Sequence, residues 1–383
     1  MVVWPVRVAV SSWNGESVMR YGVQYDRENC VTQFSPVASL LREALSAPGL
    51  TRTATQQEWE RALSETSSLY FDLLGEVPLS VLSGWLTGSD SGLTGTVRRL
   101  VLAADENEVN LYYQDEETGM YYASRADLVT VEQINAVTAA IVDNGADFSF
   151  ELEEFSALSG DTMLLPETPK PRVYAAANPL AGETQSEEID QDSVLGKLLQ
   201  ALSFPDNSYI YSGTDQDQVI RSGNDTLRIS SDAAVRYVCA EGEPSRYQIP
   251  AQGGRPTQFE IAQTCRNLAE RAAGSLSGAG RLYLQEMRQN ENGWQIDFGY
   301  CLDGAAVQVR ESGYAARFQV EGSEITQFTM YLRSYTDTGT RSEVLPERQA
   351  VAAMEAMKAQ GSDLLLVYRY MGGDTVLAGW VAE

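Results

Sequence analysis

The sequence predicts an α+β protein in which an N-terminal mixed α/β domain is followed by repeated units, each with a helix covering an antiparallel sheet. Three observations predict this class. Short runs of alternating apolar residues are joined by turn residues, amphipathic helical segments lie between them, and a helix followed by a hairpin recurs in the second half. A chain of 383 residues is long for one domain, so we expect more than one.

Residues 1–160 are expected to form the N-terminal domain. VRVAV and MRYGVQYD are strand-like, and SPVASLLREALSAP predicts a helix with Ser35 as its N-cap and Pro36 in its first position. A second helix is expected in TATQQEWERALSET, and SSLYFDLLGEVPLSVLSGWL predicts a strand, a turn and a short helix. TVRRLVLAAD, EVNLYYQDE and GMYYASR predict an antiparallel meander, and TVEQINAVTAAIVDNG a closing helix with Gly145 as its C-cap.

Residues 161–191 differ in character, because they are rich in proline and acidic residues and show no hydrophobic periodicity. This composition predicts a connector between domains. Residues 192–275 are expected to form a middle unit of a helix and an antiparallel sheet, which ends in the helix of the next unit. Residues 276–383 are expected to form a C-terminal α+β unit.

Two hairpins are predicted in the C-terminal unit. Asn292–Gly293 is a strong turn signal, and the last run, LLLVYRYMGGDTVLAGWVAE, predicts a second hairpin around Gly372–Gly373–Asp374. We expect this second hairpin to close the sheet of the last unit and not to form a site. After the first turn, alternation predicts one buried face, with Trp294, Ile296, Phe298 and Tyr300, and one solvated face, with Gln295, Asp297 and Gly299.

Charge and residue content exclude several classes of function. A net charge of −25, from 28 basic and 53 acidic residues, argues against nucleic acid and anionic lipid as the main partners. The chain has no histidine, which excludes Ser-His-Asp and Cys-His catalysis and nearly every usual catalytic zinc site. We therefore expect no enzyme activity, no cofactor and no metal.

The four cysteines, Cys30, Cys239, Cys265 and Cys301, form no CxxC pair, which excludes a structural zinc finger or a thioredoxin-like motif. Cys265 lies on the apolar side of a predicted helix and Cys239 lies in a predicted strand. Buried free thiols are favoured, with disulfides as the alternative.

Four tyrosines are the best candidates for a binding patch. Adjacent residues of a strand point to opposite faces, so one member of each pair Tyr112–Tyr113 and Tyr121–Tyr122 is expected to be exposed and to contact a partner. Exposed aromatic rings also stack on sugars or anchor proteins.

Acidic runs are the candidates for catalysis. A glycosidase needs two carboxylates across a cleft, and these runs are expected in turns or in the connector, where solvated charge is favoured over catalysis. We assign no catalytic, cofactor-binding or metal-binding residue. The runs are Asp115–Glu116–Glu117, Glu151 with Glu153 and Glu154, and Glu187–Glu188.

The first residues, MVVWPVRVAVSSW, pass directly into a predicted strand and lack the features of a signal peptide. No stretch reaches the roughly 18 apolar residues that a transmembrane helix needs. Two locations are left open: the cytoplasm, or the outer face of a membrane with the anchor outside this sequence.

Several segments resemble one known family. SPVASLLREAL and TQQEWERALSETSSLYFDLLGEVPLSVLSGWL, and then GNDTLRISSDAAVRYVCA, YAARFQVEGSEITQFTMYL and LPERQAVAAMEAMKAQGSDLLLVYRY, resemble the YycH regulators in element order and apolar spacing. The last three segments resemble the part that YycH shares with its companion YycI. These proteins are accessory to the essential WalK–WalR two-component system of Gram-positive bacteria. The family has no catalytic motif to transfer.

The resemblance implies a non-enzymatic, extracytoplasmic regulatory module of cell-envelope signalling. Its implied partners are a membrane sensor histidine kinase and a companion regulator, and its implied location is the extracytoplasmic face of the membrane, held by an N-terminal transmembrane helix. The alternative function is a carbohydrate-binding or carbohydrate-active envelope protein, and the alternative location is the cytoplasm. A structural or ligand-sensing envelope domain without a kinase partner is a third hypothesis.

Overall fold

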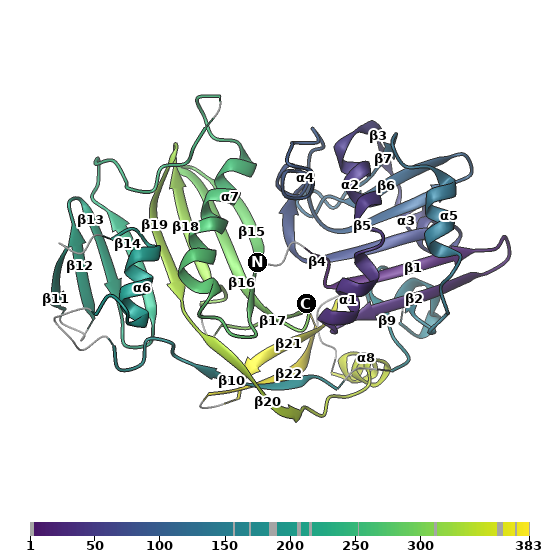
Figure 1. The fold of residues 1–383 in the computed structure, drawn as a ribbon. Helices are drawn as coiled ribbons and strands as arrows, with labels where there is room; N and C mark the ends of the chain where they lie inside the picture. Colours follow the sequence, from purple (N-terminus) through teal and green to yellow (C-terminus); the bar gives the residue numbers. More distant parts are fainter. Residues whose placement is uncertain are drawn as a thin grey trace.

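Two large β-sheets make up most of the molecule and lie beside one another (Figure 1). The structure is a computed structural model, and helices and antiparallel strands alternate through it, which confirms the α+β class. It describes residues 4–155, 158–167, 170–183, 190–204, 208–213, 217–251, 253–309, 312–357, 363–371 and 374–382.

The first sheet has seven antiparallel strands in the order β2-β1-β4-β5-β6-β7-β3. Both of its faces are covered, so successive residues of each strand enter different cores. Helices α1, α2, α4 and α5 pack on one face, and α3 packs on the other with Trp59 at its centre. The strands are β1 Arg7–Trp13, β2 Val18–Gln24, β3 Pro48–Ala54, β4 Ser68–Pro78, β5 Thr96–Asp105, β6 Glu108–Gln114 and β7 Tyr121–Ala126.

The helices of this region confirm some boundaries and correct others. They are α1 Arg27–Phe34, α2 Ala38–Ser46, α3 Gln56–Ser64, α4 Leu79–Thr87 and α5 Val131–Thr138. The prediction that Ser35 is an N-cap is wrong: Ser35 ends α1, which the sequence analysis missed, and α2 starts after Val37 without a side-chain cap. The prediction for Gly145 is also wrong, because α5 already ends at Thr138 and Val142 is 77% exposed.

The second sheet has thirteen strands, twelve of them in the order β11-β12-β13-β14-β19-β18-β16-β17-β21-β22-β10-β20, with β15 paired to β16. All pairs are antiparallel except β17 with β21. The strands are β10 Arg172–Ala177, β11 Tyr209–Ser212, β12 Gln218–Ser222, β13 Asp225–Ile229, β14 Ala234–Cys239, β15 Arg281–Asn290, β16 Gly293–Leu302, β17 Ala305–Val307, β18 Ala316–Glu321, β19 Glu324–Tyr331, β20 Ser334–Arg341, β21 Leu364–Tyr370 and β22 Thr375–Ala382.

The expected repeat of helix-on-sheet units is not confirmed, because the strands assigned to separate units belong to this one sheet. Helices α6 (Val194–Ala201) and α7 (Gln258–Ala269) bury their apolar stripes in the hydrophobic core that both sheets share. Helix α8 (Glu347–Ala356) instead packs on Phe155, Leu158 and Leu164 from the first half of the chain. Leu164 lies in the short strand β9 (Met163–Leu164), which pairs with β8 (Asp147–Phe148).

Two expectations about the later strands need correction. Residues 161–191 contain β10, which pairs with β20 and β22, so part of the expected connector is a sheet strand. The expected solvated face of β16 is also wrong, since Asp297 and Gly299 are buried. Asp297 pairs with Arg317, and a Cβ on Gly299 would lie 2.6 Å from the ring of Tyr283. The proposed domain boundaries themselves stay a prediction.

The terminal hairpin β21–β22 is confirmed, although Gly372 and Gly373 of its turn lie outside the described residues. It belongs to the second sheet, between β17 on one side and β10 on the other, and Figure 1 shows it at the bottom of the molecule, between the two regions. Tyr25, in the loop after β2, accepts a hydrogen bond from the Leu366 amide at 3.1 Å. The hairpin therefore connects the second sheet to the first. It does not only close the last unit, as the sequence analysis expected.

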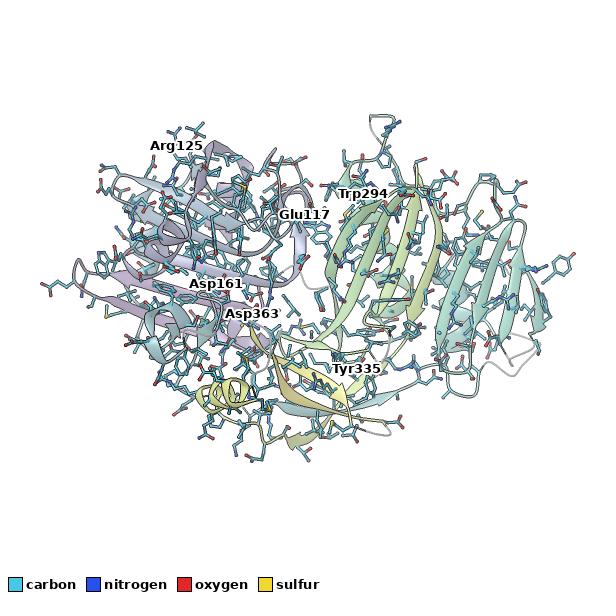
Figure 2. All side chains as sticks on the ribbon, turned by 180° about the vertical axis from the view of Figure 1, so that it is seen from behind. Glu117, Arg125, Asp161, Trp294, Tyr335 and Asp363 are labelled. Carbon is cyan, nitrogen blue, oxygen red and sulfur yellow. The ribbon has the colours of Figure 1, made fainter. Side chains whose placement is uncertain are left out.

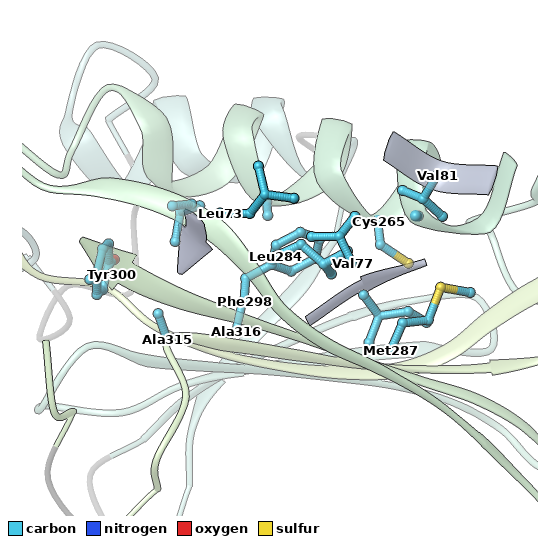
Figure 3. Packing of buried hydrophobic residues seen from close by; sticks show 14 of the residues in the cluster. Leu73, Val77, Val81, Cys265, Leu284, Met287, Phe298, Tyr300, Ala315 and Ala316 are labelled. Atoms are coloured by element: carbon cyan, nitrogen blue, oxygen red, sulfur yellow. The ribbon is translucent and has the colours of Figure 1, made fainter. Parts of the chain in front are cut away.

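A common hydrophobic core also joins the two sheets. Figure 3 shows Leu73, Val77 and Val81 from β4 and α4 packed among side chains of α7, β15 and β16. The approach is so close at Gly75 that a Cβ there would lie 1.9 Å from the carbonyl oxygen of Leu284. Above this core, the indole Nε1 of Trp85 in α4 donates to Gln263 of α7 at 2.8 Å.

The prediction of buried free thiols is confirmed, since all four cysteines are buried and unpaired. Among the helices that the structure describes, none is long and apolar enough to cross a membrane.

Candidate functional site

A network of buried charges lies where the first sheet meets the terminal hairpin. Arg99 of β5 donates to Asp161 at 2.8 Å and also to Asp363, the residue before β21. Arg98 reaches the same Asp363 at 3.2 Å. The side chains of Arg99, Asp161 and Asp363 are 8%, 5% and 14% exposed, so these pairs are largely shielded from water. Figure 2 shows Asp161 and Asp363 next to each other at this junction.

Asp72 of β4 extends the network into the sheet. Its side chain is fully buried and lies 3.0 Å from Arg7, 3.4 Å from Arg98 and 3.8 Å from Arg99. Burial by itself would raise the pKa of Asp72, but the three guanidinium groups hold the pKa well below its usual range. The pKa of Asp363 is lowered in the same way, because Arg99 and Arg98 outweigh its desolvation.

A cavity of about 420 Å³ opens beside this network. Most of its lining side chains are polar and are held by neighbours in the chain. Gln56 donates to Glu60 at 2.9 Å, and Ser159 donates to Asp161 at 2.5 Å. The lining residues are Gln56, Trp59, Glu60, Arg99, Gln114, Glu116, Tyr121, Leu158, Ser159, Gly160, Asp161 and Asp363.

Three lining groups make no hydrogen bond within the described part of the chain: the indole Nε1 of Trp59, the carboxylate of Glu116 and the hydroxyl of Tyr121. Trp59 is 1% exposed, so its N–H is a buried donor without an acceptor there. Burial raises the pKa of Glu116, although Arg99 opposes the shift. Burial also raises the pKa of Tyr121 to about 12. The cavity lining thus contains one uncommitted acid and one uncommitted hydroxyl, while the Trp59 N–H is shielded from solvent.

The structure places the four predicted tyrosines differently from one another. The expectation of exposure is wrong for Tyr112 and Tyr113, each 1% exposed, because helices cover both faces of the sheet. Tyr112 donates to Asp105 at 2.5 Å, and Tyr113 stacks on Tyr122 with 5.4 Å between ring centroids. Tyr121 and Tyr122 are half-buried, and of the four only Tyr121 lines the cavity. A partner-binding role for the tyrosines stays a prediction.

The acidic runs are less solvated than expected. Asp115 is buried and accepts from the Thr96 amide at 2.9 Å, while Glu117 accepts from the Thr96 hydroxyl at 3.1 Å. Glu151 pairs with the buried Arg20 at 2.6 Å. The expectation of solvated charge is wrong for Asp115 and Glu151, which are shielded and paired in the fold, and holds for Glu117, which is exposed. Glu153 is exposed, Glu154 lies 3.5 Å from Arg348, and Glu187 and Glu188 lie outside the described residues.

Sequence analysis missed Arg99, Asp161 and Asp363 as members of a site. A signal for Arg99 was available, since Arg98 and Arg99 interrupt the apolar strand TVRRLVLAAD. A cation in a buried strand needs an anionic partner. The partners could not be identified in this way, because Asp161 and Asp363 follow 62 and 264 residues later.

Comparison with known proteins gives one informative result. No family model matches the chain, and no curated protein matches it. Among solved structures, the chain is similar to the crystal structure of YycH from Bacillus subtilis, with a TM-score of 0.53 and 12% sequence identity. The similarity covers 100% of this chain and 94% of that one. The chain has a YycH-like fold.

This finding confirms the resemblance inferred from the sequence at the level of fold. The YycH-like fold extends over both sheets, including the terminal hairpin and the segment that holds Asp161, because the whole chain is covered. At 12% identity the similarity establishes the architecture and assigns no residue a role. Within the described residues, no group of three or more acidic or cysteine side chains could hold a metal ion.

Proposed function

We propose that this protein is a non-enzymatic regulator of cell-envelope signalling, which binds a membrane sensor histidine kinase and a companion regulator on the extracytoplasmic face of the membrane. The observation that carries the proposal is the YycH-like fold over the entire chain. The net charge of −25 agrees with a protein partner, since it disfavours nucleic acid and anionic lipid.

The edge strand β3 is the surface that we propose for the kinase. It ends the seven-stranded sheet, so one side of its backbone has no partner strand among the described residues and is available for strand addition. Leu50 of β3 is 76% exposed, and Tyr122 of the neighbouring strand β7 is half-buried beside Thr53. The proposed contact therefore combines an open backbone edge with an exposed apolar side chain.

Glycoside hydrolysis receives less support from the cavity. That reaction requires two carboxylates with different roles on either side of a bond. Glu116 is uncommitted, but Asp161 and Asp363 are both paired with Arg99, and Glu60 accepts from Gln56. One free carboxylate favours binding of a polar ligand over its hydrolysis, so carbohydrate binding is the second candidate function.

Affinity purification from the native host tests the proposal. The tagged full-length gene product is isolated from gently solubilised membranes, and co-purifying proteins are identified by mass spectrometry. We expect a sensor histidine kinase, with recovery reduced at least about tenfold by Leu50→Glu, because a charge at the centre of an apolar contact is strongly unfavourable.

Val142→Glu is the matched control, since Val142 is as exposed as Leu50, at 77%, but lies after α5 and outside the β3 edge. It should leave kinase recovery unchanged. A protein found in the cytosol without a kinase would contradict the proposed function, and equal loss in both variants would contradict the proposed surface.

A further inference from the structure

Strands β11 to β14 of the second sheet carry helices on one face only. In Figure 1, α6 and α7 lie in front of this sheet, and Figure 2 shows the opposite face, where none of the described helices covers these strands. Adjacent residues of a strand point to opposite faces, so β12, β13 and β14 each send a hydrophobic side chain into the core and an arginine to the other side. The hydrophobic side chains are those of Ile220, Leu227 and Tyr237, and the arginines, all exposed, are Arg221, Arg228 and Arg236. These three arginines form a basic strip on a protein with a net charge of −25.

The basic strip is not neutralised by the described part of the chain. Arg228 and Arg236 are direct partners across the antiparallel pair β13–β14, and like charges in this arrangement destabilise a sheet. Neither arginine forms an ion pair with a described residue, and Asp232, in the turn between the two strands, is hydrogen-bonded within that turn. Farther along the same face, Arg317 is paired with Asp297 at 2.6 Å. The strip therefore keeps a positive charge that carboxylates of a partner can neutralise.

Exposed tyrosines border the basic strip. Tyr209 and Tyr211 lie on the same face in β11, the strand that ends the sheet, and they are 81% and 41% exposed. Tyr209 is the register partner of Arg221, and the guanidinium carbon of Arg221 lies 5.7 Å from the ring centroid of Tyr211. Val238 of β14, on the other side of the strip, is 50% exposed. The face thus combines arginine and tyrosine, two residue types that are enriched where proteins bind one another.

We propose that this face binds an acidic peptide segment of a partner protein, in which carboxylates alternate with apolar or aromatic residues. The carboxylates pair with Arg228 and Arg236, since a guanidinium group forms two parallel hydrogen bonds to a carboxylate. The apolar residues of the segment pack on Tyr209 and Tyr211. Because neighbouring strands lie about 4.8 Å apart, carboxylates from nearby residues of one segment reach both arginines. This face belongs to the sheet that does not contain β3, so the inference goes beyond the proposed kinase contact.

The surroundings of the basic strip favour a narrow segment over a lipid surface. Beyond Val238 the surface is acidic, with Glu241, Glu243 and Glu321 around a depression at the end of β14. At physiological salt, charges farther apart than roughly 8 Å are largely screened, so a single segment on the strip responds mainly to the arginines. An anionic bilayer extends over a wider area, meets these glutamates as well and is repelled by them.

Calorimetric titration of the complete chain with an end-blocked peptide of alternating glutamate and tyrosine, at neutral pH and low salt, tests the inference. The same peptide with glutamine in place of glutamate should bind at least about tenfold more weakly. Arg236→Gln should weaken binding of the glutamate peptide by about ten- to a hundredfold, the range expected for hydrogen bonds between charged groups. Arg341→Gln is the matched control, since it removes the same charge from an exposed position in β20, at the other end of the sheet, and should leave the affinity unchanged.

Urea unfolding distinguishes a binding role of the strip from a structural one. The unfolding midpoint of Arg236→Gln should equal or exceed that of wild type, because repulsion from Arg228 is relieved. A lower midpoint would mean that Arg236 supports the fold and overturns the proposal. Absence of saturable binding of the glutamate peptide, or equal affinity of wild type and Arg236→Gln, overturns it as well. Binding through Arg236 to vesicles of equal parts phosphatidylcholine and phosphatidylglycerol, without binding of the peptide, overturns it in favour of lipid.

Discussion

The two sheets bury charge in different ways. In the first sheet both partners of an ion pair are buried: the side chains of Arg7 and Asp72 are 3% and 0% exposed. In the pair Asp297–Arg317 of the second sheet one partner reaches solvent: Asp297 is 7% exposed, but Arg317 is 36% exposed. When one member of a pair with two buried partners is lost, water cannot reach the remaining charge to solvate it. The first sheet should therefore depend on charge pairing, and the second on packing of its rings and aliphatic side chains.

Loss of a buried carboxylate should have the largest effect on the free energy of unfolding, and the size of this effect should differ between the two regions. Asp72→Asn leaves Arg7, Arg98 and Arg99 without their shared anion, so we expect a loss of about 3–5 kcal/mol in the free energy of unfolding. Asp297→Asn should cost only about 1 kcal/mol, because water can solvate Arg317. Urea unfolding measures both, and equal losses would contradict the comparison.

Removal of apolar volume should not distinguish the regions. Leu268 of α7 and Leu45 of α2 are 1% and 0% exposed, and they lie in the parts of the common core that belong to the second and the first region. Leu268→Ala and Leu45→Ala should each cost about 3–4 kcal/mol through lost transfer energy and the cavity left behind. Urea unfolding at low and high salt is the measurement. These losses should be independent of salt, and a strong salt dependence in either variant would mean that packing and pairing are not separable.

Glu347 links the two regions and should make stability depend on pH. It is 3% exposed at the start of α8, and it accepts hydrogen bonds from Gln24 of β2 and from the Leu165 amide. Burial raises the pKa of Glu347 from 4.5 to about 7. A raised carboxyl pKa means that the folded state holds the proton more tightly, so the contribution is complete below pH 4.5 and is lost as the pH rises to about 7.

Thermal and urea unfolding between pH 4.5 and 8 check this expectation. Wild type should lose about 3 kcal/mol across this range relative to Glu347→Gln, which has no titrating group at this position. Parallel pH profiles of the two proteins would show that Glu347 does not titrate in this interval. A profile of the opposite slope would mean that the hydrogen bonds from Gln24 and Leu165 outweigh burial.

Removal of a helix cap should have the smallest effect on the free energy of unfolding, and this effect should be of equal size in the two regions. Thr55 caps α3 and Thr257 caps α7, each by a reciprocal arrangement with a glutamate three residues later. Thr55→Ala and Thr257→Ala should each cost about 1 kcal/mol, since the lost hydrogen bond is local and exposed. Urea unfolding again provides the value. A clearly larger loss at one site would show that this cap also supports its sheet.

Local sequence patterns predicted most of the elements. Alternation located the meander β5–β6–β7, and the apolar stripe of Ile261, Cys265 and Leu268 located α7. Patterns of this kind depend on neighbours a few residues apart. They carry no information on which element covers the second face of a strand, and for this reason the burial of Tyr112 and Asp297 was not foreseen. Strand β10 was missed because it is short and flanked by proline.

The candidate site was predictable only in fragments. Glu116 and Tyr121 were singled out separately, one as part of an acidic run and one as part of a tyrosine pair, and the fold places both on one cavity. Trp59 had no polar signal, since its significance lies in an N–H that lacks a partner in the folded chain. Asp363 was unpredictable because it meets Arg99 only through the insertion of β21 between β17 and β22.

That insertion also sets the order in which the protein can be completed on the ribosome. Residues 1–126 contain every strand of the first sheet. The ion pairs of Arg98 and Arg99 with Asp363 and the pairing of β17 with β21 form only after the C-terminal residues have been synthesised. At synthesis rates of roughly 5–20 residues per second, the delay between synthesis of Arg99 and Asp363 is on the order of tens of seconds. During that interval Arg98 and Arg99 have Asp72 and Asp161 as anionic partners but lack Asp363, and the incomplete state can be recognised by chaperones and proteases.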